Sequence, residues 1–337
     1  MRKNKQLTNW ILNAKQESLL SIEERRLYYQ RLREYCKNRK LTNTTPMATK
    51  IGPLLKKTTG AICRKLCIVL AGGDVEVVTD GLENIPKEPV IFASTHQGIL
   101  DNFVWIPDCP KHAIIFHGAE VKKWLLFAQI NTGLILVSRN HAKKENRLNA
   151  KLDMISLLLY GHSVFICPEG IWNLSPNRLY LPLNWGIVDI AQKAEVPIVP
   201  VVIENTHDTS NAKERITKVH IRYGSPVIVK ETDELSVKLE EYKEKISTIR
   251  WELIEEKGLY LRRNITNMDY INFIEGNMKN LKMGGINIEL ENERIQGANQ
   301  DFFEFHHINN VPWDAWGELL ETEEVRKIKR INKEHEI

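Results

Sequence analysis

The chain has 337 residues, 42% of them hydrophobic, so it can form one large α/β domain with extensions or two ordinary domains. The formal net charge of +4 is unevenly distributed: residues 1–66 contain 16 Lys and Arg against four Glu, a net charge of +12. The sequence lacks an apolar run of about 18 residues, a signal-peptide core and a disulfide framework, which argues against a membrane-spanning or secreted protein.

Residues 1–72 are expected to form a basic, helical N-terminal extension. Apolar residues recur at helical spacing over 17–40, and a second basic amphipathic segment covers 48–70. This second helix either packs on the domain with its lysines in solvent or lies on anionic lipid. A basic end can also attract an acidic carrier protein or nucleic acid. Zinc-finger spacing, basic-region heptads and RNA-binding aromatic motifs are absent from the sequence, so we expect no nucleic acid partner.

Residues 73–260 are expected to form the main α/β domain. Short apolar runs alternate there with helical stretches, the pattern of a mostly parallel central sheet flanked by helices. The expected strands are 75–78, 90–94, 113–117, 134–138, 163–167, 198–204 and 218–224. The expected helices are 119–130, 146–160 and a long charged helix over 234–258. Functional groups in such sheets gather where parallel strands end.

Residues 261–337 are expected to form a C-terminal extension, helical in part. They mix Asn, Glu and Lys with aromatic residues such as Phe302 and Trp313, which favours a folded extension over a disordered one. The final stretch, EEVRKIKRINKEHEI, is expected to be a solvated helix or a frayed tail.

His96 and Asp101 stand where the apolar strand 90–94 ends and a helix can begin. A carboxylate bonded to one imidazole nitrogen fixes the tautomer and stabilises the imidazolium, so the other nitrogen can accept a proton. Since the sequence has no G-x-S-x-G elbow, the nucleophile would come from a substrate. The alternative is a surface histidine followed by an aspartate that interacts with a helix dipole.

Two further strands place polar residues at the same edge of the expected sheet. Strand 163–167 is followed by Glu169, held between Pro168 and the turn residue Gly170. Strand 134–138 is followed by Arg139, whose guanidinium could bind a phosphate with two hydrogen bonds. Alone, the Glu169 stretch could equally be a strand-to-loop turn, and the Arg139 stretch could be the solvent-exposed start of a charged helix.

These stretches together resemble four motifs of the lysophospholipid acyltransferase superfamily. His96 to Asp101 is similar to its H-x4-D motif, GLILVSR (133–139) to its second block, FICPEG (165–170) to its third and VPIVPVVI (196–203) to its fourth. The resemblance covers about residues 90–225 and implies acyl transfer from a thioester to an acceptor hydroxyl.

The resemblance also implies roles for individual residues. His96 would be the general base and Asp101 its orienting partner, while Arg139, Glu169 and Gly170 would line the acceptor site. The co-substrate would be acyl-CoA or an acyl carrier protein thioester, with no metal or other cofactor. The acceptor would be a lysophospholipid or a glycerol-phosphate-like molecule.

The sequence departs from the family pattern at four positions. Thr95 replaces the usual asparagine, and Gly98 replaces the usual serine near a possible oxyanion site. Ile171 and Trp172 replace the usual threonine and arginine, so the acceptor pocket is expected to differ or to rely on Arg139 for phosphate. The loop WNLSPN (172–177) either covers the acceptor or is a structural turn.

Two other classes of protein remain possible from the sequence. One is a catalytically inactive lipid-binding or acyl-carrier-binding module of the same fold. The other is a metallohydrolase, which is disfavoured because His117 and His162 would have to converge on His96, Asp101 and Glu169. We expect a cytoplasmic protein, peripheral on the inner face of the membrane, without a transmembrane helix.

Overall fold

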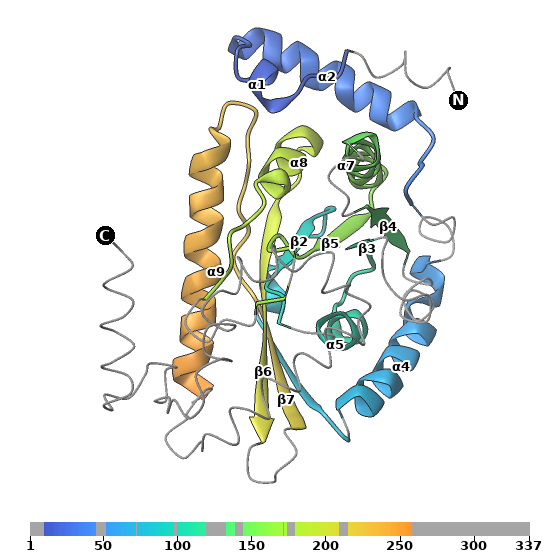
Figure 1. Cartoon of the computed structure of the whole chain (residues 1–337), viewed down its shortest axis with the longest axis vertical. Coiled ribbons are helices and arrows are strands. Elements are labelled where there is room, and N and C mark those ends of the chain that lie inside the picture. Colours follow the sequence, from blue (N-terminus) through green and yellow to red (C-terminus); the bar gives the residue numbers. More distant parts are fainter. Residues whose placement is uncertain are drawn as a thin grey trace, which may run out of the picture.

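The protein forms a seven-stranded sheet covered by helices on both faces (Figure 1). The computed structural model describes residues 10–44, 52–71, 73–97, 100–118, 133–138, 144–170, 172–173, 179–208 and 215–257. The expected helix 119–130 and the expected C-terminal extension 261–337 lie outside these residues.

All seven expected strands are present. They are β1 (Glu76–Asp80), β2 (Ile91–Ser94), β3 (Ala113–Gly118), β4 (Leu134–Val137), β5 (Ser163–Ile166), β6 (Ile198–Asp208) and β7 (Arg215–Tyr223). Their order in the sheet is β1-β7-β6-β2-β5-β3-β4. Strand β7 runs antiparallel to β6 and parallel to β1, and the remaining neighbours in this order pair in parallel. The prediction of a mostly parallel α/β sheet is therefore confirmed.

Strand β2 lies in the interior of the sheet between two parallel neighbours, β5 and β6. Its four residues are all buried, and their side chains alternate between the two hydrophobic clusters. Ile91 and Ala93 contribute to one cluster and Phe92 to the other. Because parallel strands end at the same edge, the segments that follow β2 and β5 emerge side by side.

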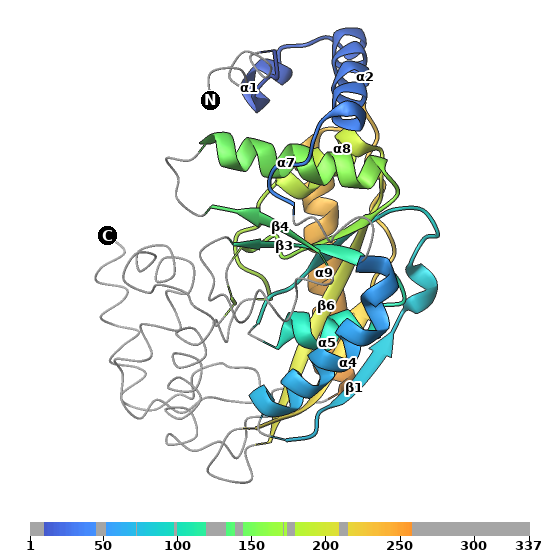
Figure 2. The ribbon, with the colours of Figure 1, turned by 90° about the vertical axis from the view of Figure 1, so that its right-hand side faces the viewer.

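Helices cover the sheet in two layers, as Figures 1 and 2 show. The first cluster packs between the sheet and α7 (Lys144–Leu159), α8 (Gly186–Ala194) and α9 (Leu235–Lys257). The second packs between the sheet and α4 (Gly52–Ala71) and α5 (Asp101–Asp108). Helix α8 was not predicted from the sequence, because its nine residues are fewer than the roughly 11 over which helical periodicity can be recognised.

The N-terminal helices α1 (Ala14–Glu17) and α2 (Ile22–Asn38) form a further layer against α7 and α8. Helix α2 begins with a capping box, in which the Ser21 hydroxyl accepts from the backbone N–H of Glu24 and the Glu24 carboxylate accepts from that of Ser21. The helix expected over 17–40 is thus confirmed, as is the one expected over 48–70 as α4.

A buried ion cluster joins α1 to the domain. Lys193 of α8 contacts Glu17 at 2.7 Å and also pairs with Asp189, which pairs in turn with Lys151 of α7. Burial alone would raise the pKa of Asp189, but Lys151 and Lys193 hold it below its ordinary value. The cluster is therefore charged and fixes α1 against α7 and α8.

In the part of the chain that the structure describes, no helix is both long enough and apolar enough to cross a membrane.

Candidate active site

The candidate site begins where β2 ends. The Thr95 N–H donates to the Val201 carbonyl at 3.1 Å, and the Thr95 hydroxyl accepts from the Ile203 N–H at 3.1 Å, so β2 stays attached to β6 up to the residue before His96. Thr95, which replaces the asparagine of the family pattern, therefore has a structural role here. The backbone leading to His96 is rigid on this side.

His96 and Asp101 are in direct contact. The Nδ1 of His96 lies 2.7 Å from Oδ2 of Asp101, and the same oxygen accepts the backbone N–H of Gln97 at 2.7 Å. Asp101 is the first residue of α5 and is fully buried, whereas the His96 side chain is 18% exposed. A carboxylate at Nδ1 favours the tautomer that carries its proton on Nδ1, which leaves Nε2 to accept one. The sequence-predicted pair is thus brought together in the geometry of a base and its orienting group.

Glu169 contacts the backbone of the same segment. Its Oε1 accepts the His96 N–H at 3.0 Å, and its Oε2 accepts the Leu181 N–H at 2.8 Å. Burial raises the pKa of Glu169 to about 7, against the opposing effects of these two hydrogen bonds and the positive charge of Arg250. Because both of its oxygens accept from backbone N–H groups, Glu169 holds the chain segments around His96 and Leu181 together.

Gly170 forms the turn after β5. Its φ of +68° lies in the left-handed region that favours glycine, and its N–H donates to the Cys167 carbonyl at 3.0 Å. The turn residue inferred from PEG is therefore confirmed as a turn, and the turn fixes the position of Glu169.

Trp172 packs against His96. Its ring meets the His96 imidazole edge to face, with centroids 6.0 Å apart, and its side chain is only 5% exposed. The following N–H, of Asn173, donates to the His96 carbonyl at 2.6 Å. Trp172 thus covers one side of the imidazole, at a position where the family pattern has a long cation.

Three sequence-predicted site residues, Gly98, Arg139 and Ile171, lie outside the described residues. The structure therefore brings together His96, Asp101, Glu169, Gly170 and Trp172 from the predicted set.

A polar network beside His96 was not predicted from the sequence. The Gln97 amide donates to Oε2 of Glu204 at 2.6 Å, and the Arg250 Nε donates to the same oxygen at 2.8 Å. Glu204 lies on β6 and Arg250 on α9, 46 residues apart. The sequence signal for Glu204 was a carboxylate at the end of the apolar run IVPVVIE, which resembles the ends of other expected strands.

Other nucleophiles and metal ligands do not assemble in the described part of the chain. There, no group of three or more His, Cys, Asp or Glu side chains could hold a metal ion. His162 precedes β5 whereas Glu169 follows it, so the two residues lie at opposite ends of this strand. Burial raises the pKa of the Cys36, Cys67 and Cys109 thiols to about 11, that of Cys63 to about 12 and that of Cys167 well above its ordinary value.

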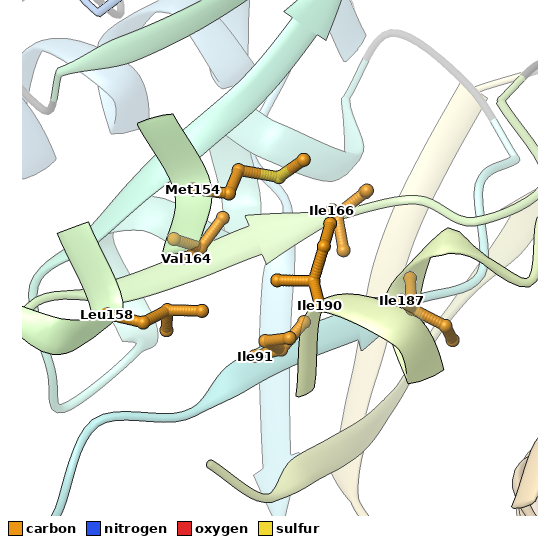
Figure 3. A pocket seen from close by; sticks show the side chains of 7 residues that line it. All are labelled: Ile91, Met154, Leu158, Val164, Ile166, Ile187 and Ile190. Atoms are coloured by element: carbon orange, nitrogen blue, oxygen red, sulfur yellow. The ribbon is translucent and has the colours of Figure 1, made fainter. Parts of the chain in front are cut away.

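A narrow apolar pocket, without room for a water molecule, lies on the other face of the sheet from α5 (Figure 3). Its lining comes from β2, β5, α7 and α8 and consists of Ile91, Met154, Leu158, Val164, Ile166, Ile187 and Ile190. Because all these side chains are apolar and belong to the first hydrophobic cluster, the pocket is a gap in core packing.

His96 follows an interior parallel strand, and its partner Asp101 is the first residue of the next helix. Residues 76–204 match the family model described as Acyltransferase. The match covers less than half of the chain and is a similarity of this region to that family.

Several characterised proteins are similar to this chain over the same region. The 1-acyl-sn-glycerol-3-phosphate acyltransferase of Saccharomyces cerevisiae is 28% identical over 147 residues, which cover 41% of this chain and 45% of the yeast protein. The 1-acyl-sn-glycerol-3-phosphate acyltransferase alpha of Homo sapiens is 28% identical over 138 residues, 39% of this chain and 46% of the human one. The match thus spans less than half the length of either relative.

Among solved structures, the chain is similar to the 1-acyl-sn-glycerophosphate (LPA) acyltransferase PlsC of Thermotoga maritima. The two share 18% sequence identity with a TM-score of 0.41, over 71% of this chain and 86% of the other.

Proposed function

We propose that the protein is an O-acyltransferase that moves a fatty acyl group from a thioester donor to the hydroxyl of a lysophospholipid or glycerol-phosphate-like acceptor. The observation that carries this proposal is the 2.7 Å contact between His96 Nδ1 and the buried Asp101 carboxylate. The acyltransferase match over residues 76–204 supports the same reaction class.

In this reaction His96 acts as the general base. As the acceptor oxygen attacks the thioester carbonyl, Nε2 takes the hydroxyl proton and a C–O bond forms. The tetrahedral intermediate then collapses, the C–S bond breaks, and the imidazolium returns the proton to the leaving thiolate. Asp101 stabilises the transient imidazolium, since a buried carboxylate interacts strongly with a neighbouring cation.

The acyl donor is acyl-CoA or an acyl carrier protein thioester, and the chemistry needs no metal or further cofactor. Arg139 is the proposed ligand for an acceptor phosphate, because Trp172 and Ile171 replace the usual arginine and threonine of the third motif. Trp172 is buried against His96, so its contribution is to narrow the space beside the base.

The N-terminal extension is the proposed docking element for an anionic membrane on its cytoplasmic face. Helix α4 exposes Leu54, Ile62, Ile68 and Val69, with exposed fractions of 40 to 81%, and also carries Lys56, Lys57, Arg64 and Lys65. Exposed apolar side chains next to lysine and arginine are the composition of an interfacial helix. An acidic acyl carrier protein is the other partner that this charge would suit.

The experiment is a transfer assay with mass-spectrometric identification of products. Purified protein is incubated with acyl-CoA or acyl carrier protein thioesters and a panel of lysophospholipids, glycerol phosphate and phosphate-free acceptors. We expect an acylated product from the wild type and none from His96→Ala. Thioester or lysolipid binding by a folded wild type without any product would instead favour the inactive binding module.

A further inference from the structure

A buried ion pair lies behind the candidate base. Glu204 is fully buried on β6, and Arg250 of α9 is 5% exposed. The Arg250 Nε donates to Oε2 of Glu204 at 2.8 Å, and a second guanidinium nitrogen donates to Oε1 at 3.3 Å. Helix α9 runs alongside β6, which brings the two residues together (Figure 1).

The ion pair contacts both chain segments that hold the base. On one side Glu204 accepts from the Gln97 amide at 2.6 Å, and the Gln97 backbone N–H binds Asp101. On the other side Arg250 donates to the Leu179 carbonyl at 2.5 Å. Two residues beyond Leu179, the Leu181 N–H binds Glu169, which in turn binds the His96 N–H.

These contacts form a closed ring. It runs from His96 to Gln97, Glu204, Arg250, the 179–181 segment, Glu169 and back to the backbone of His96. A buried ion pair is often no more stabilising than well-packed apolar residues of the same size, so its presence here calls for a role beyond stability. A guanidinium can supply directed hydrogen bonds to a carboxylate and a carbonyl at once, which apolar side chains cannot.

We propose that Gln97, Glu204 and Arg250 are positioning residues that fix the backbone of residues 96–97 and thereby the His96–Asp101 contact. The inference rests on the proposed acyl transfer for its kinetic consequences. Gln97 does not act on the reacting atoms, since its amide is bound to Glu204 and its effect reaches His96 through the backbone. Loss of the ring should therefore lower turnover and leave substrate binding largely intact.

The first test is kinetic and uses the full chain. Gln97→Ala removes the link to Glu204 but keeps the ion pair, and because Gln97 is half-buried the variant should fold. We expect kcat to fall about 10- to 100-fold, since small displacements of a catalytic group have effects of this size, with KM changed less than about twofold. Arg250→Lys keeps the positive charge beside Glu204 but loses the paired hydrogen bonds of the guanidinium. It should likewise lower kcat and leave KM nearly unchanged.

Arg222→Lys is the matched control. Arg222 of β7 pairs with Glu256 of α9 at 2.7 Å and with Asp80 at 3.2 Å, so it also joins the sheet to α9 but belongs to no part of the ring. Its kcat and KM should equal those of the wild type. Equal kcat values for Gln97→Ala, Arg250→Lys and this control would overturn the proposal.

The second test does not depend on activity. The backbone N–H groups of His96 and Gln97 are bonded to Glu169 and Asp101, so they should exchange slowly with deuterated water. Hydrogen exchange of the peptide around residues 95–100, corrected for sequence, should be about tenfold faster in Gln97→Ala and Arg250→Lys and unchanged in Arg222→Lys. Faster exchange in a chain that transfers no acyl group would refute the proposed function alone, whereas unchanged exchange would refute the positioning role.

Discussion

At the residue scale, the buried carboxylate of Asp101 holds the proposed base, His96, in place. Its Oδ2 accepts from both the His96 ring and the Gln97 backbone. An asparagine can still accept the Gln97 N–H through its carbonyl oxygen, but it neither stabilises an imidazolium nor enforces the Nδ1-protonated tautomer.

We expect Asp101→Asn to fold and to lower kcat by about 10²- to 10⁴-fold, and His96→Ala to lower it at least as much. The measurement is steady-state acyl transfer, with thermal melting as the control for folding. A folded Asp101→Asn variant with wild-type kcat would remove Asp101 from the mechanism.

Glu169 gives a second prediction at this scale, for stability against pH. Burial raises its pKa from 4.5 to about 7, so between these values the folded protein holds a proton that the unfolded chain has released. The contribution of Glu169 protonation to the free energy of unfolding is therefore fully present below pH 4.5, and it is lost as the pH rises through about 7.

Glu169→Gln cannot titrate and serves as the reference for this measurement. The unfolding free energy of the wild type minus that of the variant should fall by at most about 3 kcal/mol between these two pH values. Urea unfolding across the pH series gives the difference. A difference that rises with pH would mean that the ionised form is the more stable one in the folded protein.

At the element scale, the Lys193 cluster fixes the short helix α1 to α8. Asp189 and Glu17 hold the pKa of Lys193 above its ordinary value although burial works in the opposite direction. Removing one charge from such a cluster leaves the remaining buried charges without a counter-ion.

Lys193→Met should therefore lower the unfolding free energy by about 3 to 5 kcal/mol, measured by urea unfolding. Lys243→Met, which removes a more exposed pair with Glu240, is the control and should change it by less than about 1 kcal/mol. Equal effects of the two substitutions would show that the cluster adds little to stability.

At the scale of the whole molecule, the positive charge is concentrated in the N-terminal extension, and α4 carries part of it. We expect binding to vesicles with anionic lipid to weaken steeply as salt rises from about 0.05 to about 0.5 M. The triple variant Lys57→Gln, Arg64→Gln, Lys65→Gln should bind about 100-fold more weakly at low salt, at about 1 kcal/mol for each charge.

The exposed apolar side chains of α4 should also contribute to vesicle binding. Leu54→Ser and Val69→Ser should weaken vesicle binding, whereas Val237→Ser, which replaces a similarly exposed side chain on α9, should not. Sedimentation with the vesicles measures the binding of these variants and of the control. Binding that is insensitive to salt, or no binding, would exclude the membrane proposal and favour an acidic carrier protein as the partner.

The strands of the sheet could be predicted from the sequence, but the contacts between residues far apart in the chain could not. The seven strands were found because buried parallel strands appear as continuous apolar runs. Helix α8 was too short to show a clear helical period, and the antiparallel direction of β7 could not be inferred from an apolar run that resembled the other strands. His96 and Asp101 were predictable because five residues of sequence bring them together, whereas Glu204 and Arg250 meet only after β6 and α9 have packed.

The interior position of β2 has a consequence for heat inactivation. His96 follows a strand with a parallel neighbour on each side, and we expect such a strand to open only when the whole domain does. Fraying of outer elements such as α1 should leave the His96–Asp101 contact in place. Catalytic activity should therefore persist on warming until the cooperative melting of the sheet and disappear with it, so that residual activity reports the fraction of intact domains.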